Sequence, residues 1–254
     1  MSIHPRQNML KMMLPAIRRH LEENLAAPIE SFLEDHIHDS THYRLLVDGD
    51  IAGLASVYDK TLLTMFSVEK RFRPIAAQLF TAARQLESVT TAFVPTCDEL
   101  YLSCALDVST KVEKQAYVWQ VGEGVVSAEN LRFVRATSAD YNLITHHTAD
   151  FFGDVPTIIQ NGNLYIGYRN SQPVGFGLIE PSCFYPATAS IGMFTIEQHR
   201  EQGVGTNLIR ALIDECQRRE WRAVAGCYYY NYASQYTLTK AGMYSQTRLL
   251  KIHF

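Results

Sequence analysis

Met193-Phe194-Thr195-Ile196, a short polar link, and then Arg200-Glu201-Gln202-Gly203-Val204-Gly205-Thr206-Asn207-Leu208-Ile209 form the stretch that decides the fold. The apolar segment predicts a strand. Leu208, Leu212 and Ile213 have the spacing of one buried helix face. A loop with two glycines joins the two elements. The sequence therefore predicts a strand, a glycine loop and a helix in direct succession.

The glycine loop has the properties of an anion-binding turn. Gly203 and Gly205 have no Cβ, so a ligand can approach the backbone closely. The first N–H groups of the following helix are free, and the positive end of the helix dipole lies behind them. We therefore expect a phosphate group to bind at this turn, whereas the alternative interpretation is a tight strand-to-helix connection without a ligand.

The spacing of the loop excludes two common phosphate-binding motifs. A Rossmann fingerprint needs a third small residue three positions after the second glycine, where this chain has Leu208. A Walker loop needs Gly-Lys-Ser/Thr, which does not follow the glycines. The remaining pattern is Arg-x-x-Gly-x-Gly between a strand and a helix.

A second motif follows downstream in the expected order. Residues 223–230 predict a buried strand, and Asn231, Ser234 and Lys240-Ala241-Gly242-Met243 come after it. With the glycine loop, this succession resembles the GCN5-related N-acetyltransferase (GNAT) superfamily. The resemblance covers roughly residues 130–254.

The first half of the chain reads as a degenerate copy of the second. Met65-Phe66-Ser67-Val68-Glu69 matches residues 193–197, and a predicted hairpin at residues 47–55 matches one at residues 168–177. An internal repeat explains both matches, and chance similarity between two βα units is the alternative.

The two copies differ at the glycine loop. Pro74 takes the place of Gly203, and Ala76 takes the place of Gly205. Proline has no N–H group, and alanine adds a Cβ where a pyrophosphate would press. We therefore expect the first copy to bind no CoA.

The resemblance and the repeat together imply an α/β fold (an α+β mixed sheet) built from two GNAT-like units. The expected domains are a degenerate GNAT-like domain at residues 1–124, with N-terminal helices, and an acetyl-CoA-binding GNAT domain at residues 125–254. Gly122-Glu123-Gly124 marks the boundary. Near the N-terminus, Leu10, Met13, Leu14 and Ile17 give one apolar helix face.

Composition narrows the class of protein. The 254 residues are 47% hydrophobic with a net charge of −3, and they contain no basic run, so nucleic acid is not an expected partner. No apolar run approaches the roughly 20 residues of a membrane span, so we expect a cytoplasmic protein without a membrane partner. Five scattered cysteines read as reduced thiols. The oligomeric state cannot be predicted.

Histidines give no metal-binding pattern. His146 and His147 are expected on a strand, where neighbouring side chains point apart, so no metal site is expected. His36, His38 and His42 are expected in a solvated loop before the first strand.

The resemblance implies transfer of an acetyl group from acetyl-CoA to an amine. It places the pantetheine arm along the backbone of a splayed central strand and the pyrophosphate on the loop amides. Asn231 and Ser234 are implied to bind the pantetheine, although Asn231 also fits a helix cap. The implied cofactor-binding residues are Phe194, Thr195, Ile196, Arg200, Glu201, Gln202, Gly203, Val204, Gly205, Thr206, Asn231 and Ser234.

The groups that move protons are less clear. Many family members have a glutamate base about eleven residues before the loop arginine, where this chain has Ala189 and Ser190. Glu180 is the nearest carboxylate in sequence, and a solvent-facing turn residue is its alternative interpretation.

Protonation of the CoA thiolate is equally open. The family's acid position, two residues before the lysine of Lys-x-Gly, is Leu238, and Tyr236 is the nearest helix tyrosine. Tyr236 is therefore the candidate catalytic acid. Core packing of Tyr236, with solvent, Tyr230 or Tyr232 as the acid, is the alternative.

The acceptor is expected to be a small-molecule amine, because the near-neutral chain shows no docking surface for a charged protein tail. Loops at residues 150–163 and 181–188 contain Phe151, Phe152, Phe184 and Tyr185. These side chains suit an apolar or planar part of the acceptor, although core packing explains them equally well. A non-catalytic module that binds or senses acyl-CoA is the alternative function.

Overall fold

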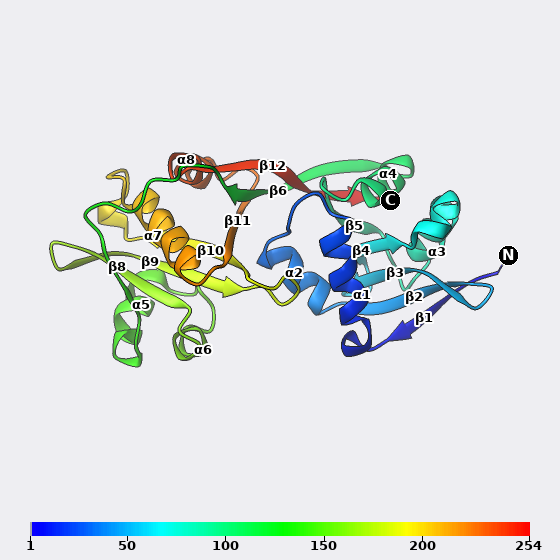
Figure 1. Cartoon of the computed structure of the whole chain (residues 1–254), viewed down its shortest axis with the longest axis horizontal. Coiled ribbons are helices and arrows are strands. Elements are labelled where there is room, and N and C mark those ends of the chain that lie inside the picture. The colour runs from blue at the N-terminus through cyan, green and yellow to red at the C-terminus, as the bar shows by residue number, and fades with distance from the viewer. Residues whose placement is uncertain (1) are drawn as a thin grey trace. The chain divides into compact units, whose positions relative to one another are not determined.

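The computed structural model describes residues 2–254, and these form two compact units. Unit 1 comprises residues 1–118, 183–186 and 246–254, and unit 2 comprises residues 119–182 and 187–245. Each unit is a mixed sheet covered by helices (Figure 1). The α/β prediction is therefore confirmed.

The helices are α1 (Leu10–Glu23), α2 (Ser31–His38), α3 (Ala76–Arg84), α4 (Glu99–Asp107), α5 (Tyr141–Thr148), α6 (Val155–Gln160), α7 (Val204–Arg218) and α8 (Tyr232–Lys240). The strands are β1 (Ile3–Asn8), β2 (Thr41–Val47), β3 (Asp50–Tyr58), β4 (Leu62–Val68), β5 (Thr91–Pro95), β6 (Lys111–Val121), β7 (Arg132–Arg135), β8 (Leu164–Arg169), β9 (Gln172–Pro181), β10 (Thr188–Thr195), β11 (Arg222–Tyr228) and β12 (Met243–His253). Three short 3-10 turns are η1 (Lys70–Ile75), η2 (Ser138–Asp140) and η3 (Glu197–His199).

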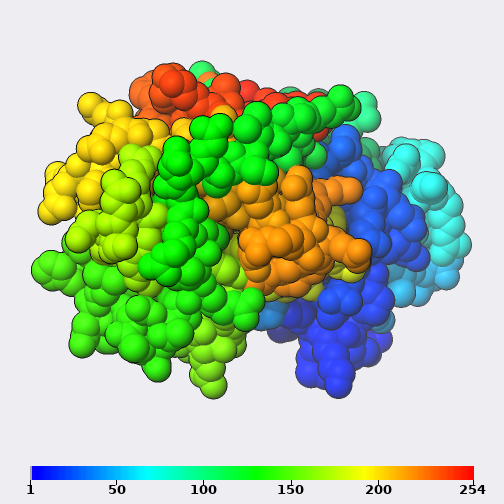
Figure 2. All heavy atoms as spheres, turned by 60° about the vertical axis from the view of Figure 1, so that its left-hand side comes forward, coloured from blue at the N-terminus to red at the C-terminus, as the bar shows by residue number. Residues whose placement is uncertain are grey.

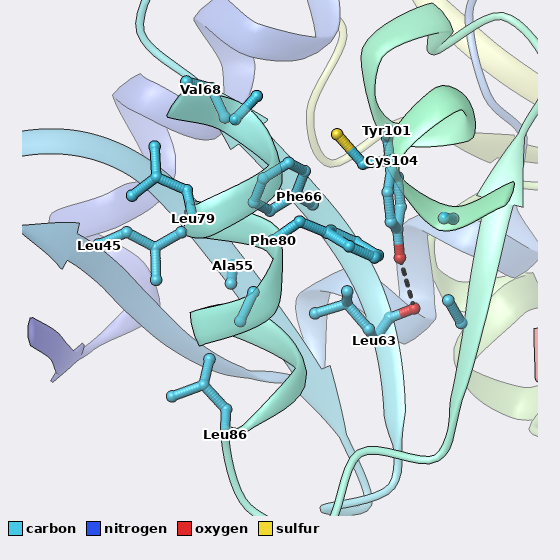
Figure 3. Packing of buried hydrophobic residues seen from close by; sticks show 14 of the residues in the cluster. Leu45, Ala55, Leu63, Phe66, Val68, Leu79, Phe80, Leu86, Tyr101 and Cys104 are labelled. Carbon is cyan, nitrogen blue, oxygen red and sulfur yellow. Dashed lines mark hydrogen bonds between the residues drawn. The ribbon is translucent and has the colours of Figure 1, made fainter. Parts of the chain in front are cut away.

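Unit 1 is built on antiparallel hairpins, with the strand order β1-β2-β3-β4-β5-β12-β6. The turn between β2 and β3 uses Asp48 and Gly49, both with positive φ, as a tight hairpin turn requires. One apolar cluster packs α3 and α4 on the sheet and includes Phe66, Phe80 and Tyr101 (Figure 3). A second apolar cluster packs α1 and α2 against the sheet. Met13 and Ile17 of α1 are buried in it, which confirms the predicted apolar face of that helix.

Two segments of unit 1 come from late in the chain. Residues 246–254, which include most of β12, belong to unit 1. Within them, β12 pairs with β5 in antiparallel register, from Leu249 opposite Pro95 to His253 opposite Thr91. Residues 183–186, from the connection between β9 and β10, contribute Phe184 to the cluster around α1 and α2. Domains at residues 1–124 and 125–254 remain a prediction, since unit 1 includes both of these segments from the second half of the chain.

Unit 2 repeats the same succession of elements. Its strands follow the order β11-β10-β9-β8-β7, and the ends of β6 and β12 also belong to it. Helix α7 lies across β9 and β10 (Figure 1) because Leu208 and Leu212 fill the space over Gly175 and Gly177. The other face is covered by α5 and α6, whose apolar cluster includes Phe176. The predicted helix after the glycine loop, with Leu208, Leu212 and Ile213 on its buried face, is confirmed as α7, and the repeated hairpin is confirmed as β8 and β9.

Two expectations about histidines are wrong. His146 and His147 lie in helix α5 and not on a strand, because the segment has the length and the upstream Thr137–Asp140 capping box of a helix start. His42 is buried in β2, where its Nδ1 contacts the Ser56 hydroxyl at 2.9 Å, and His36 and His38 lie in α2. The expected loop before the first strand is therefore largely helical.

Candidate functional site

The central parallel strands of unit 2 separate part of the way along their length. The register pairs β10 with β11 only over Thr188–Ser190, opposite Arg222–Val224. Beyond Ser190, β10 remains paired with β9 on its other edge, up to Thr195 opposite Gly175. The backbone from Ile191 to Thr195 therefore faces a gap where an extended ligand can add hydrogen bonds in the manner of a strand.

The predicted phosphate loop follows directly at the end of β10. Glu201 and Gly203 have φ of +61° and +74°, so both lie in the left-handed region of the turn that leads into α7. Arg200 is exposed, and its Nε donates to the Thr195 carbonyl at 3.4 Å, which returns the guanidinium to the end of β10. The segment around residue 200 lies at the molecular surface, in yellow in Figure 2. The loop is accessible to a ligand.

The start of α7 has the character of an anion site. Gly203 is the N-cap residue and supplies no side-chain cap, so within residues 2–254 the first N–H groups of the helix have no capping side chain. A Cβ on Gly205 would lie 3.1 Å from Met193 Cε and 3.2 Å from both Thr195 Oγ1 and Thr237 Cγ2. Only glycine therefore leaves this part of the cradle open.

Helix α8 presents its first turn beside this cradle. Asn231 caps the helix, since its Oδ1 accepts the Ser234 N–H at 3.0 Å, which leaves its amide NH₂ for another partner. Thr237 is on the same side of α8 and faces Gly205. Asn231 and Ser234 are thus brought to the loop side of the gap.

Tyr236 lies elsewhere on α8. Its side chain is 63% exposed, so the alternative that it packs in the core is wrong, and the ammonium of Lys240 lies 4.9 Å from its ring centroid. Leu238 is buried instead. Two residues on a helix are about 200° apart, so Tyr236 is on the face of α8 opposite Ser234 and Leu238. The structure does not bring Tyr236 together with the loop.

The corresponding gap in unit 1 is filled by a side chain. Strand β4 pairs with β5 only at Leu62 and Leu63. Tyr101 is three residues after the cap of α4, the position that Ser234 has relative to the cap of α8. Its side chain is 1% exposed. Its hydroxyl donates to the Leu63 carbonyl at 2.9 Å, where the pairing ends (Figure 3). Burial raises the pKa of Tyr101, so this hydroxyl stays protonated and remains a donor.

A hydrogen-bonded chain closes the same region of unit 1. Arg73 Nη2 donates to Asn24 Oδ1 at 3.2 Å, and Asn24 Nδ2 lies 3.3 Å from His20 Nδ1. His20 Nε2 contacts the Asp98 carboxylate at 3.1 Å, and Asp98 also caps α4 by accepting the Tyr101 N–H. These side chains connect the turn after β4 to the cap of α4. Sequence patterns did not indicate them, because each residue type is ordinary at its position.

Polar groups that could serve acid–base chemistry lie at the start of β10. Glu180 on β9 is directly opposite Ser190, so the two side chains share a face of the sheet. Ser190 is buried and Glu180 is half-buried. Cys227 is buried in β11, and its Sγ accepts a hydrogen bond from the Trp119 indole N–H at 3.3 Å.

The aromatic residues of the predicted acceptor loops separate into two groups. Phe184 is buried in the core of unit 1, and the Tyr185 hydroxyl accepts the Ile29 N–H at 3.4 Å in the same unit. Phe152 is buried in unit 2, whereas Phe151 is 58% exposed. Core packing therefore accounts for all of them except Phe151.

Two other kinds of site are absent from residues 2–254. No helix in this range combines the length and the apolar character needed to cross a membrane. No group of three or more histidine, cysteine or acidic side chains in the same range is arranged to hold a metal ion.

Comparison with known proteins gives a consistent result. Residues 11–122 match the family model described as an acetyltransferase (GNAT) domain, and residues 131–243 match that of the acetyltransferase (GNAT) family. No curated protein matches the chain in sequence.

Solved structures share the fold over the whole chain. A GNAT-family acetyltransferase from Colwellia psychrerythraea has 17% identity and a TM-score of 0.86, with 100% of both chains covered. A GCN5-related N-acetyltransferase from Sphaerobacter thermophilus has 13% identity and a TM-score of 0.68, with 99% of this chain and 95% of that chain covered.

A tandem GNAT protein from the clavulanic acid biosynthesis pathway has 12% identity and a TM-score of 0.64, with 99% of this chain and 98% of that chain covered. With two family matches in succession, two units of like topology and a strand gap beside a glycine loop, the chain belongs to the GNAT family of acyltransferases as a tandem member.

Proposed function

We propose that this protein is a cytoplasmic N-acetyltransferase that moves an acetyl group from acetyl-CoA to the amine of a small molecule. The observation that carries the proposal is the open gap between β10 and β11, which leads to an uncapped helix N-terminus. Three residues after the cap of α8, unit 2 has Ser234, a small side chain that leaves the gap open. At the equivalent position of α4, Tyr101 fills the gap of unit 1.

Different groups of residues are proposed to bind different parts of acetyl-CoA. The backbone of Phe194, Thr195 and Ile196 offers the strand-like edge for the pantetheine arm, and Asn231 and Ser234 face it from α8. The N–H groups from Glu201 to Thr206, which include Gln202, Gly203, Val204 and Gly205, are proposed to bind the pyrophosphate together with Arg200.

The reaction requires two proton movements. The acceptor amine loses a proton, its nitrogen bonds to the acetyl carbon, the carbon–sulfur bond breaks, and the sulfur takes up a proton. In the proposal, the protein contributes by holding both reactants in position, which lowers the entropic cost of their encounter. Tyr236 is the proposed acid, with solvent, Tyr230 and Tyr232 as alternatives.

A non-catalytic acyl-CoA sensor is the second candidate. It is favoured by Ala189 at the family's base position and by the outward orientation of Tyr236. Mixing the protein with acetyl-CoA, a panel of amines and a thiol reagent distinguishes the two functions. An enzyme releases thiol faster when an amine is present. Tight acetyl-CoA binding without amine-stimulated thiol release across the panel would establish the sensor.

Replacing Gly205 by glutamate should abolish acetyl-CoA binding, because it places a carboxylate where the pyrophosphate is proposed to lie. Calorimetric titration measures the affinity, and thermal melting checks the fold. Gly205→Ala is the matched control, since it adds the same Cβ, with contacts of 3.1–3.2 Å, but no charge. It should weaken binding much less. Unchanged affinity in the glutamate variant would remove this loop from the cofactor site.

Titration of the wild-type protein should give one acetyl-CoA per chain. Tyr101 and the chain from Arg73 to Asp98 occupy unit 1, and Pro74 and Ala76 remove a donor and add bulk at its loop. The same titration of the Gly205→Glu variant should give no site at all. Two sites in the wild type would show that unit 1 also binds the cofactor.

Tyr236→Phe removes one hydroxyl and little volume, so it tests the acid directly. If Tyr236 protonates the leaving thiolate, kcat should fall at least about 10²-fold, as is usual for loss of a general acid, while acetyl-CoA affinity is kept. Tyr244→Phe, at another exposed tyrosine, should leave kcat unchanged. If kcat of the Tyr236 variant stays within a few fold of wild type, protonation comes from solvent or another tyrosine.

A further inference from the structure

A cleft lies within unit 1, between helix α1 and the residues at the end of β4. One stripe of α1, which includes Ala16, His20 and Glu23, forms one wall, and the segment from Glu69 to Arg71 forms the other. The volume of this α1–β4 cleft is about 260 Å³. At ~30 Å³ for each water molecule, it has room for about nine waters, or for a ligand of about ten non-hydrogen atoms.

The floor of the α1–β4 cleft is the sheet. Ser67 of β4 is in register with Leu54 of β3, so their side chains share one face of the sheet. Leu54 packs with Met13 and Ile17, so this face is the one that α1 covers (Figure 1). Ser67 is 8% exposed, and among residues 2–254 no group forms a hydrogen bond with its hydroxyl. The floor therefore holds a buried hydroxyl that a polar group of a ligand can satisfy.

Hydrogen bonds between side chains hold the two walls in place. Arg19 of α1 donates to the Glu69 carboxylate, and Arg73 Nη2 donates to Asn24 Oδ1 at 3.2 Å. His20, at the back of the cleft, is 6% exposed, and both of its ring nitrogens have the partners described above. The walls are thus tied together at two points, with the cleft between α1 and the end of β4.

The charged side chains of the cleft have both signs. Arg19 and Arg71 already have carboxylate partners. Lys70 and Glu23 are exposed, and over the described residues neither side chain has an ion pair or a hydrogen bond. The α1–β4 cleft therefore offers one cation and one anion that are not yet paired.

This pair of charges is complementary to a zwitterion. A lysine ammonium binds a carboxylate, and a glutamate carboxylate binds an ammonium group, each through charge-assisted hydrogen bonds. A simple anion would meet the negative charge of Glu23, and a simple cation would meet the positive charge of Lys70. A free α-amino acid with a neutral side chain carries both of the required charges and has the size of the cleft.

We propose that the α1–β4 cleft of unit 1 binds a free α-amino acid with a neutral, polar side chain. Lys70 binds its carboxylate, Glu23 binds its ammonium group, and the Ser67 hydroxyl binds its side chain. Unit 1, which lacks the glycine loop, then has a ligand of its own. None of these residues belongs to the acetyl-CoA site proposed in unit 2, so either proposal can fail without the other.

L-Glutamine and two of its analogues test the class of ligand. Glutaramic acid lacks the ammonium group of L-glutamine, and 4-aminobutanamide lacks its carboxylate. Calorimetric titration of the full chain should give a Kd of about 1 mM or tighter for L-glutamine. Each analogue should bind at least about 10-fold more weakly, because it loses a hydrogen bond between charged groups.

Lys70→Met and Glu23→Gln test the two charges. Each should raise the Kd for L-glutamine at least about 10-fold. Both side chains are exposed, so thermal melting should match the wild type. Lys11→Met and Glu22→Gln are the matched controls, since both residues are exposed on α1 outside the cleft, and they should leave the Kd unchanged.

The Glu23→Gln variant also gives a readout that a purely structural role of Glu23 would not change. Its Kd values for L-glutamine and glutaramic acid should become equal within a few fold, because the ammonium group has lost its partner. The proposal is overturned if the wild type does not bind L-glutamine at concentrations up to about 10 mM. It is also overturned if either analogue binds as tightly as L-glutamine, or if Lys70→Met and Glu23→Gln keep the wild-type Kd.

Discussion

The separation of β10 from β11 after Ser190 is the constraint on which the rest of the structure depends. Backbone groups that lose a strand partner inside a protein cost about 1–3 kcal/mol each unless another group satisfies them. Unit 1 meets this cost internally, through the Tyr101 hydroxyl on the Leu63 carbonyl. Unit 2 has Ser234 at the equivalent place, so its gap stays open to a ligand. The residue at one helix position therefore differs between the unit whose strand gap is filled and the unit whose gap is open.

In unit 1 the Tyr101 side chain fills the gap between β4 and β5 from within. Unit 1 no longer needs glycines at its loop, which is consistent with Pro74 and Ala76 there. It also contains residues 246–254, the end of the last strand, and residues 183–186, which connect β9 to β10. Both segments are covalently continuous with unit 2. The half of the chain that carries the glycine loop therefore cannot be cut free without removing two segments from the core of unit 1.

Patterns among neighbouring residues predicted much of this structure. Features that depend on contacts between distant segments could not be predicted in this way. The hairpins, the buried face of α1 and the start of α7 depend on neighbouring residues, so turn chemistry and periodicity located them. The burial of His42 and the exchange of residues 246–254 depend on which strands pair, which no local pattern encodes. Tyr101 shows the same limit. An aromatic residue in a helix has the same sequence pattern when it packs in a core and when it fills a groove that a ligand would otherwise occupy.

The proposed arrangement also separates its charges by enough distance to keep them independent. At ~3.3 Å per residue, the strand from Ser190 to Ile196 is about 20 Å long. This exceeds the Debye length of ~8 Å at physiological ionic strength. The charge of Glu180 at one end of this strand is therefore largely screened from a pyrophosphate that is proposed to lie at the other end, with Arg200 and the start of α7.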